Sequence, residues 1–203
     1  MIFGLENKNV LITGGSRGIG KAIALAFAER GSRIVICGRT ETTLDTAVDE
    51  MRKRGSKAWS FVSDVSDYHA LENLVSNAAQ AMGGIDILIS NVGTAFQSPL
   101  IEIEMDHLRR SFEINFFSHF SLAKLIAQLF IEQGNKGQML FNISKQAVNP
   151  GRNFGAYGLP KSTLMFLVKQ LALELGSYGI RVNGINADRI RSGMLSEEFI
   201  AER

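Results

Sequence analysis

The chain has 203 residues, of which 45% are hydrophobic and 21% are charged, and it contains 20 glycines. This composition fits one globular domain with enough apolar surface for a core, and it excludes a disordered or fibrous chain. The formal net charge is +2 with both signs interspersed, so no basic face for nucleic acid is expected.

Short apolar runs alternate with longer helical patterns along the chain. The strand candidates are NVLIT (9–13), RIVIC (33–37), AWSFV (58–62), DILIS (86–90), QMLFNIS (138–144) and IRVNGIN (180–186). This alternation is typical of a parallel sheet with crossover helices on both faces. No repeat or linker divides the chain. We therefore expect an α/β fold, a doubly wound Rossmann sheet, as a single domain over residues 1–203.

Two helical patterns are clear, but no strand pattern is found near the end of the sequence. A helix is predicted over residues 18–30, ending at Gly31, and the longest helical pattern runs from about Leu108 to Ile131. No further strand pattern follows residue 186. The sequence therefore predicts either a shortened domain without its last strand or a longer chain beyond residue 203.

Targeting and metal signals are weak. Cys37 lies in an apolar run, which predicts a buried core thiol and a reducing compartment. The N-terminus has no signal-peptide pattern, and no run approaches the roughly 20 apolar residues of a membrane helix. We expect a cytoplasmic protein with no membrane partner. His69, His107 and His119 lack metal-ligand spacing, so no metal site is expected.

A glycine-rich turn, TGGSRGIG (13–20), follows the first strand candidate and leads into a helical pattern. Glycines permit the tight turn and let backbone amides and a helix N-terminus approach a pyrophosphate. The strand before, the helix after and the second strand provide the context that this motif requires. We expect dinucleotide phosphates to be bound by Gly14, Ser16, Arg17, Gly18, Ile19 and Gly20.

The end of the second strand indicates which dinucleotide binds. An NAD site usually has an acidic residue there, roughly 20 residues beyond the glycines, for the ribose 2′-hydroxyl. This sequence has Gly38 and Arg39 instead. Arg39 can pair with a 2′-phosphate, and Arg17 can approach the same group. We expect NADP(H) to be preferred over NAD(H).

Tyr157 and Lys161 lie four residues apart in the stretch FNISKQAVNPGRNFGAYGLPK (141–161), so they share one helix face. A nearby ammonium and a positive nicotinamide would lower the pKa of the phenol from its usual value near 10. Tyr157 is then a general acid in reduction and a general base in oxidation. Because Pro160 fits best in a first turn, the helix is expected to begin close to Tyr157.

These motifs, in this order, resemble the classical short-chain dehydrogenases/reductases over nearly the whole chain. The resemblance implies a nicotinamide cofactor and hydride transfer on an alcohol or carbonyl compound. It also implies that Lys161 holds the nicotinamide ribose and that Asn115 is the catalytic asparagine of the long helix. The resemblance also implies further contacts with the cofactor: Asp64 and Val65 at the adenine ring, the turn Asn91, Val92 and Gly93, and Ser192 near the nicotinamide carboxamide.

The chain departs from that family's pattern in several places. Val92 replaces the alanine of an Asn-Ala-Gly turn, and Ala187 and Asp188 replace a Pro-Gly pair. By the resemblance, the chain also ends before a substrate-lid helix. The stretches NISKQAVNPGRNFGAYGLPK and NADRIRSG are similar to the dehydrogenase portion of bifunctional aldolase/short-chain dehydrogenase proteins, although no aldolase portion is present.

In the family a serine near the end of the fifth strand donates a hydrogen bond to the substrate carbonyl. The family spacing counted back from Tyr157 gives Ser144, whereas counting along the strand gives Lys145. Neighbouring strand residues point to opposite faces, so we expect only one of them in the site. Ser144 is favoured because a second ammonium near Lys161 would be repelled. An inward Lys145 would instead hold a carboxylate or phosphate, with Arg152 in support.

The sequence therefore supports two hypotheses. The first is an NADP(H)-dependent oxidoreductase for a small carbonyl or alcohol compound, in which Tyr157 transfers the proton, Ser144 polarises the oxygen, and Lys161 and Asn115 assist. The second is a dinucleotide-binding sensor or interaction protein without turnover. By analogy with the family, we expect a homodimer or homotetramer that associates through the helices containing Asn115 and Tyr157.

Overall fold

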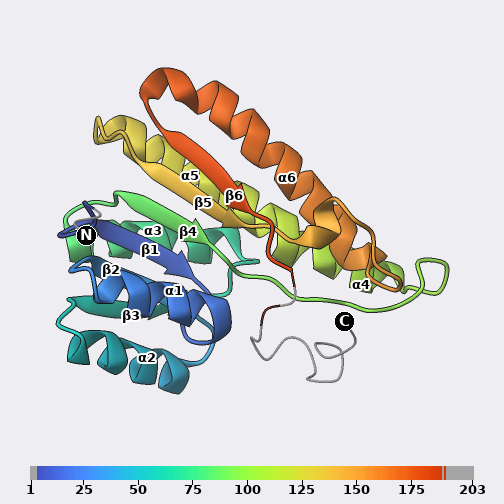
Figure 1. The fold of residues 1–203 in the computed structure, drawn as a ribbon, viewed down its shortest axis with the longest axis horizontal. Helices are drawn as coiled ribbons and strands as arrows, with labels where there is room; N and C mark the ends of the chain where they lie inside the picture. Colours follow the sequence, from blue (N-terminus) through green and yellow to red (C-terminus); the bar gives the residue numbers. More distant parts are fainter. Residues whose placement is uncertain (1–3, 189, 191–203) are drawn as a thin grey trace.

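The structure is a computed structural model that describes residues 4–188 and residue 190. Six parallel strands form one sheet in the order β3-β2-β1-β4-β5-β6 (Figure 1). The strands are β1 (Asn9–Thr13), β2 (Arg33–Gly38), β3 (Ala58–Val62), β4 (Ile87–Ser90), β5 (Gln138–Asn142) and β6 (Arg181–Ile185). The order reverses between β1 and β4, as in a doubly wound Rossmann sheet. The predicted fold class is confirmed.

Helices cover both faces of the sheet. They are α1 (Gly18–Ala28), α2 (Glu41–Lys53), α3 (Tyr68–Met82), α4 (Met105–Phe112), α5 (Ser118–Glu132) and α6 (Gly155–Leu175). A π-helical turn (Glu113–Phe117) joins α4 to α5, and two 3-10 turns occur at Lys145–Ala147 and Gly176–Tyr178. Buried side chains of α1 and α2 pack on one face, and those of α3, α5 and α6 pack on the other.

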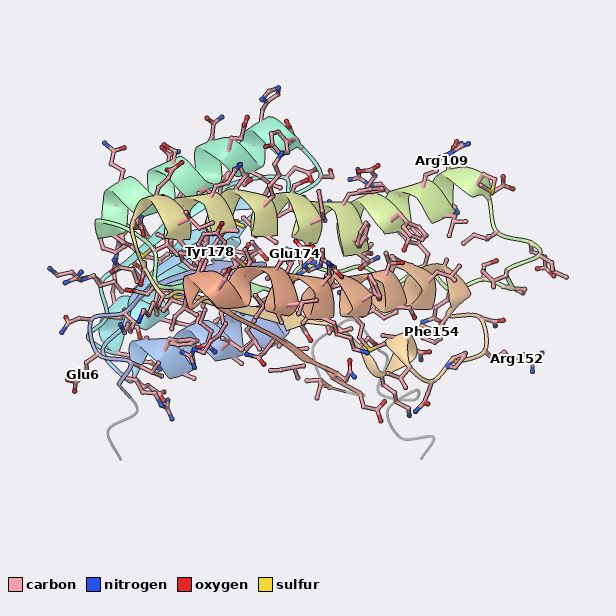
Figure 2. The ribbon with its side chains drawn as sticks, turned by 90° about the horizontal axis from the view of Figure 1, so that it is seen from above. Glu6, Arg109, Arg152, Phe154, Glu174 and Tyr178 are labelled. Carbon is pink, nitrogen blue, oxygen red and sulfur yellow. The ribbon has the colours of Figure 1, made fainter. Side chains whose placement is uncertain are left out.

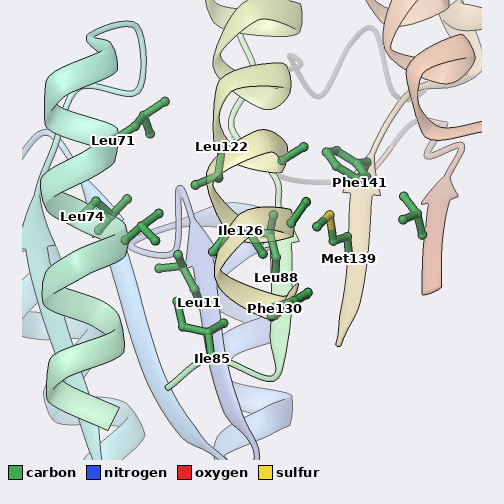
Figure 3. Close-up of a cluster of buried hydrophobic side chains, with 14 of the residues drawn as sticks. Leu11, Leu71, Leu74, Ile85, Leu88, Leu122, Ile126, Phe130, Met139 and Phe141 are labelled. Atoms are coloured by element: carbon green, nitrogen blue, oxygen red, sulfur yellow. The ribbon is translucent and has the colours of Figure 1, made fainter. Parts of the chain in front are cut away.

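Two apolar cores explain why the central strands are apolar at consecutive positions. All five residues of β1 are buried, because Val10 and Ile12 face one core while Leu11 faces the other. Figure 3 shows the larger core, in which side chains of β1, β4 and β5 meet those of α3 and α5. Cys37 is also fully buried there, as predicted, and burial raises the pKa of its thiol to about 12.

The segment Met105–Glu132 is one continuous helix, so the prediction of a long helix in this region is confirmed. By length and composition alone this helix could cross a membrane, a property that the buried core helix of a soluble protein can share. Its buried side chains, including Leu122, Ile126 and Phe130, pack in the larger core beside α3 (Figure 3). This packing is that of a core helix.

Pro160 leaves one backbone carbonyl in the first turn of α6 without its helical hydrogen bond. The helix begins at Gly155, slightly before Tyr157, so Pro160 lies within it and cannot donate to the carbonyl of Ala156. The hydroxyl of Ser111, which is fully buried in α4, donates to this carbonyl at 2.7 Å instead. This bond ties α4 to the first turn of α6.

Candidate active site

Three neighbouring strands end in one hydrogen-bonded group of polar residues. Asn91, which directly follows β4, binds the end of β1 with both its backbone and its side chain. Its backbone N donates to Thr13 Oγ1 at 3.0 Å, and its side-chain Nδ2 donates to Thr13 O at 3.2 Å. From the end of β5, Asn142 Nδ2 donates to Asn91 Oδ1 at 3.0 Å. These bonds fix the carboxyl ends of the strands, where ligands bind in open α/β sheets.

The glycine-rich turn is shaped for close backbone approach. Gly14 and Gly18 have φ of +66° and +54°, which favour glycine. A Cβ at Gly20 would lie 2.2 Å from Gly14 O, so α1 begins in direct contact with the turn. Arg17 precedes α1 without a side-chain capping bond, which leaves the first amides of the helix available to an anion. The residues therefore fit a dinucleotide pyrophosphate.

Two charged residues follow the ends of β2 and β3. Arg39 is exposed directly after β2, and Asp64 lies after β3 near the buried Val65. Hydrogen bonds from the backbone N and hydroxyl of Ser66, at 3.0 and 2.7 Å, lower the pKa of the Asp64 carboxyl, and Arg110 and Arg39 add to this effect. Arg39 thus contributes positive potential where the adenosine ribose of a dinucleotide would lie.

Asn115, in the π-helical turn, holds the loop after β4. Its Oδ1 accepts from Thr94 N at 3.0 Å, and its Nδ2 donates to Thr94 O at 2.8 Å and to Ser111 Oγ at 3.0 Å. Gly93 fits closely beside it, since a Cβ there would lie 3.2 Å from Asn115 Oδ1. The amide of Asn115 therefore positions the loop and, through Ser111 and Ala156 O, the start of α6.

His119, one helical turn further along, holds the same loop. Its Nε2 lies 2.9 Å from Val92 O and its Nδ1 lies 2.6 Å from Ser90 Oγ. Because Val92 O only accepts, Nε2 carries the proton and Ser90 donates to Nδ1. Burial is the main cause that holds the pKa of His119 well below its usual value, and the nearby charge of Lys161 lowers it further. His119 is thus a neutral, fully hydrogen-bonded residue.

Tyr157 and Lys161 lie side by side at the N-terminal part of α6. Lys161 is 1% exposed, its Nζ donates to Asn142 O at 2.9 Å, and this Nζ lies 5.8 Å from the centre of the Tyr157 ring. Burial lowers the pKa of Lys161 to about 7. Burial raises the pKa of Tyr157, and the hydrogen bond with the Ser144 hydroxyl offsets this in part.

In this structure burial outweighs any effect of Lys161 on the pKa of Tyr157, and the expected lowering by Lys161 together with a bound nicotinamide stays a prediction. The same burial acts on both groups and disfavours the charged form of each. Ser144 is the residue whose hydrogen bond favours phenolate.

Ser144 and Lys145 both line one cavity of about 340 Å³, together with Tyr157. The expectation that only one of them could face the site is wrong, because β5 ends at Asn142 and strand alternation ends with it. Ser144 instead begins a 3-10 turn, where its Oγ accepts from Gln146 N at 3.1 Å.

The chain matches the family model of short chain dehydrogenases over residues 8–203. It belongs to the short-chain dehydrogenase family.

Relatives support this assignment. The 7alpha-hydroxysteroid dehydrogenase of Escherichia coli (strain K12) is 33% identical over 198 residues, which cover 98% of this chain and 77% of that protein. A dehydrogenase/reductase structure from Sinorhizobium meliloti 1021 has a TM-score of 0.91 at 28% identity and covers 98% of this chain and 79% of that one. A 7 alpha-hydroxysteroid dehydrogenase complexed with NADH and 7-oxo glycochenodeoxycholic acid has a TM-score of 0.90 at 32% identity, with 96% and 77% covered.

In this short-chain dehydrogenase the structure brings most of the predicted site residues together. The cavity is lined by Ile19, Asn91, Gly93, Ser144, Lys145, Arg152, Tyr157 and Lys161. Asn115 lies directly behind Gly93, and Val92 packs against Gly14. Arg39, Asp64 and Val65 follow the neighbouring strands β2 and β3, outside the cavity lining. Ser192 lies outside the described residues.

Sequence reasoning missed five residues of the site: Ser111, His119, Asn142, Gln146 and Asp188. One of them, His119, had a detectable signal. His119 follows Asn115 by four residues and therefore shares its helix face. Pro160 implied an unpaired carbonyl at Ala156, although nothing in the sequence identified Ser111 as its donor.

The whole arrangement suits the chemistry of the family, whose members bind nicotinamide dinucleotides and transfer hydride between them and carbonyl or alcohol compounds. The glycine turn and α1 accept the phosphates, and the cavity at the ends of β4 and β5 offers room for the nicotinamide and a small substrate. A phenol, a hydroxyl and an ammonium lie around that cavity.

Proposed function

We propose that this protein is an NADP(H)-dependent oxidoreductase that moves hydride between nicotinamide C4 and a carbonyl or secondary-alcohol carbon. The observation that carries this proposal is that Tyr157, Ser144 and Lys161 line one cavity. The cavity lies directly beyond the glycine-rich turn, so one bound molecule could span both.

The bound nicotinamide supplies the hydride in reduction and accepts it in oxidation. In reduction, Ser144 donates a hydrogen bond to the substrate oxygen, and Tyr157 gives its proton to that oxygen as negative charge develops there. Lys161, with a pKa near 7, can give or take the proton that restores Tyr157 at neutral pH. Asn115 supports this relay by holding the loop and the first turn of α6 in place.

Replacing Tyr157 by phenylalanine tests the proton-transfer role. Loss of a general acid costs on the order of 10²–10⁴-fold in turnover, whereas NADPH affinity should be retained. NADPH oxidation and NADPH fluorescence titration measure the two quantities in the same preparation. An equal loss of binding and turnover would contradict the role of Tyr157, and tight NADPH binding without any turnover in the wild type would favour a sensor.

The preference for NADP(H) rests on Arg39 and Arg17. Arg17 directly precedes α1 and Arg39 directly follows β2, and a guanidinium at either position can pair with a ribose 2′-phosphate. The relative in complex with NADH shows that the family also uses the non-phosphorylated cofactor. Arg39→Ala should weaken NADPH binding by roughly tenfold to a hundredfold and leave NADH binding nearly unchanged, because charge-assisted bonds contribute about 1.5–3 kcal/mol. Arg109→Ala, on exposed α4, is the control. Equal losses for both cofactors would refute the preference.

The protein is further proposed to be a cytoplasmic homodimer or homotetramer. Leu159, Phe166 and Leu173 on α6 are 47%, 67% and 78% exposed, and their seven-residue spacing places them on one face. Phe117 and Phe120, on the neighbouring long helix, are also exposed. Figure 2 shows the long helix and α6 running beside each other. Such an apolar surface favours self-association.

A further inference from the structure

The cavity carries an ion pair that proton transfer does not use. Lys145 Nζ lies 3.3 Å from Asp188 Oδ2, and the side chains are 35% and 37% exposed. Lys145 N also donates to Ala187 O at 2.8 Å, which fixes the 3-10 turn after β5 against the loop after β6. Both charged side chains line the same cavity as Tyr157. The pair therefore lies beside the reacting groups.

The charges of the cavity favour an anion. Lys145 and Arg152 line it, whereas Asp188 is the one carboxylate among the described residues that do so. Arg152 is exposed on the loop that precedes α6 (Figure 2). A partly exposed ion pair contributes only about 0–1 kcal/mol, so a ligand anion can compete for the lysine.

Neighbouring side chains set the size of the anion-bearing molecule. Ser144, Lys145 and Gln146 are consecutive and all three line the cavity. Because both side chains line one cavity of about 340 Å³, a single small molecule can present a carbonyl to Ser144 and an anionic group to Lys145. Gln146 Oε1 is buried without a partner in the described part of the chain, which places an additional hydrogen-bonding amide beside this site.

We propose that the substrate is a small carbonyl or hydroxy compound with an anionic group, a carboxylate or phosphate, that binds Lys145 in competition with Asp188. This inference rests on the proposed function. Lys145 attracts an anionic substrate and so raises its affinity for the cavity. Asp188 neutralises Lys145 and repels the anion, and so lowers that affinity. The two residues therefore have opposite effects on the selection of charged over neutral substrates.

The test compares matched substrates with NADPH. The pairs are 2-oxobutanoate with butanone, and dihydroxyacetone phosphate with dihydroxyacetone, which separate a carboxylate from a phosphate. The readout is the ratio of kcat/KM for the charged compound to kcat/KM for the neutral one. Lys145→Met should lower this ratio at least tenfold, and Asp188→Asn should raise it several-fold. The double variant should behave as Lys145→Met, and Lys169→Met, on the exposed side of α6, should not change the ratio.

A second measurement keeps the inference independent of turnover. Binding of the unreactive carboxylate oxamate to the NADP⁺-saturated enzyme is followed by calorimetry for the same variants. Weaker binding in Lys145→Met and tighter binding in Asp188→Asn support the inference, even if no compound of the panel is reduced. Unchanged oxamate binding, or equal effects on charged and neutral substrates, overturns it while leaving the oxidoreductase proposal intact.

Discussion

Replacing Lys161 by methionine tests how strongly burial acts on the lysine of the candidate active site. Its side chain is 1% exposed, and burial lowers its pKa from 10.5 to about 7. Between these pH values the unfolded chain binds a proton that the folded chain does not, so stability rises with pH. Lys161 therefore destabilises the fold most below pH 7, and this cost fades as the pH rises towards 10.5.

From the two pKa values, burial of Lys161 lowers the free energy of unfolding by about 4 kcal/mol at pH 7 and by about 2 kcal/mol at pH 9. Methionine removes this cost but leaves Asn142 O without its donor, a loss of about 1–3 kcal/mol. Lys161→Met should therefore be more stable than the wild type by about 2 kcal/mol at pH 7 and nearly equal to it at pH 9. Turnover should be lost, because the proposed proton transfer requires the lysine.

The assay is urea unfolding of the nucleotide-free protein at pH 7 and pH 9, followed by the fluorescence of Trp59. Lys169→Met, on the exposed side of the same helix, is the control and should show no such pH-dependent difference. Ionisation of the buried Cys37 is common to all variants and cancels in the comparison. A stability difference between Lys161→Met and the wild type that is the same at both pH values would refute the reasoning.

Three other predictions concern residues away from proton transfer. His119→Phe removes the donor to Val92 O and should lower the free energy of unfolding in urea by about 1–3 kcal/mol at pH 7. Below about pH 6.5 the wild type should lose stability, because His119 is then protonated in the unfolded chain but not in the folded one. His119→Phe should lose less stability over this pH range. An equal loss in both proteins would contradict the conclusion that His119 is neutral in the folded protein. Gln146→Met should not lower the melting temperature, because Oε1 has no partner in the described structure; a clear fall would disprove this. Leu173→Arg should shift the oligomer towards monomer in sedimentation, and an unchanged mass would rule out the proposed α6 interface.

The sheet was predictable from sequence because its strands are buried on both faces. Continuous apolar runs such as NVLIT and RIVIC gave β1 and most of β2 directly. Strand ends were less predictable. The run QMLFNIS suggested a strand up to Ser144, but β5 ends at Asn142, because the Ser144 side chain caps the following 3-10 turn. A local hydrogen bond of this kind competes with the ladder without changing the apolar pattern.

The candidate site was predictable where chemistry depends on spacing along the chain. Tyr157 and Lys161 are four residues apart on one helix, and the glycine turn is continuous in sequence. The contacts that hold them were not predictable, because they join distant segments: Ser111 to Ala156, and His119 to Ser90. The pKa of Tyr157 also depends on burial, which the spacing of two charges does not reveal.

The most direct test of the central claim is to follow the hydride itself. NADPH with deuterium on one or the other face of nicotinamide C4 is incubated with the enzyme and a carbonyl compound that it reduces, and the alcohol is analysed by mass spectrometry. The account predicts deuterium on the carbinol carbon from only one of the two labelled forms. No transfer of deuterium into the alcohol from either form would contradict it.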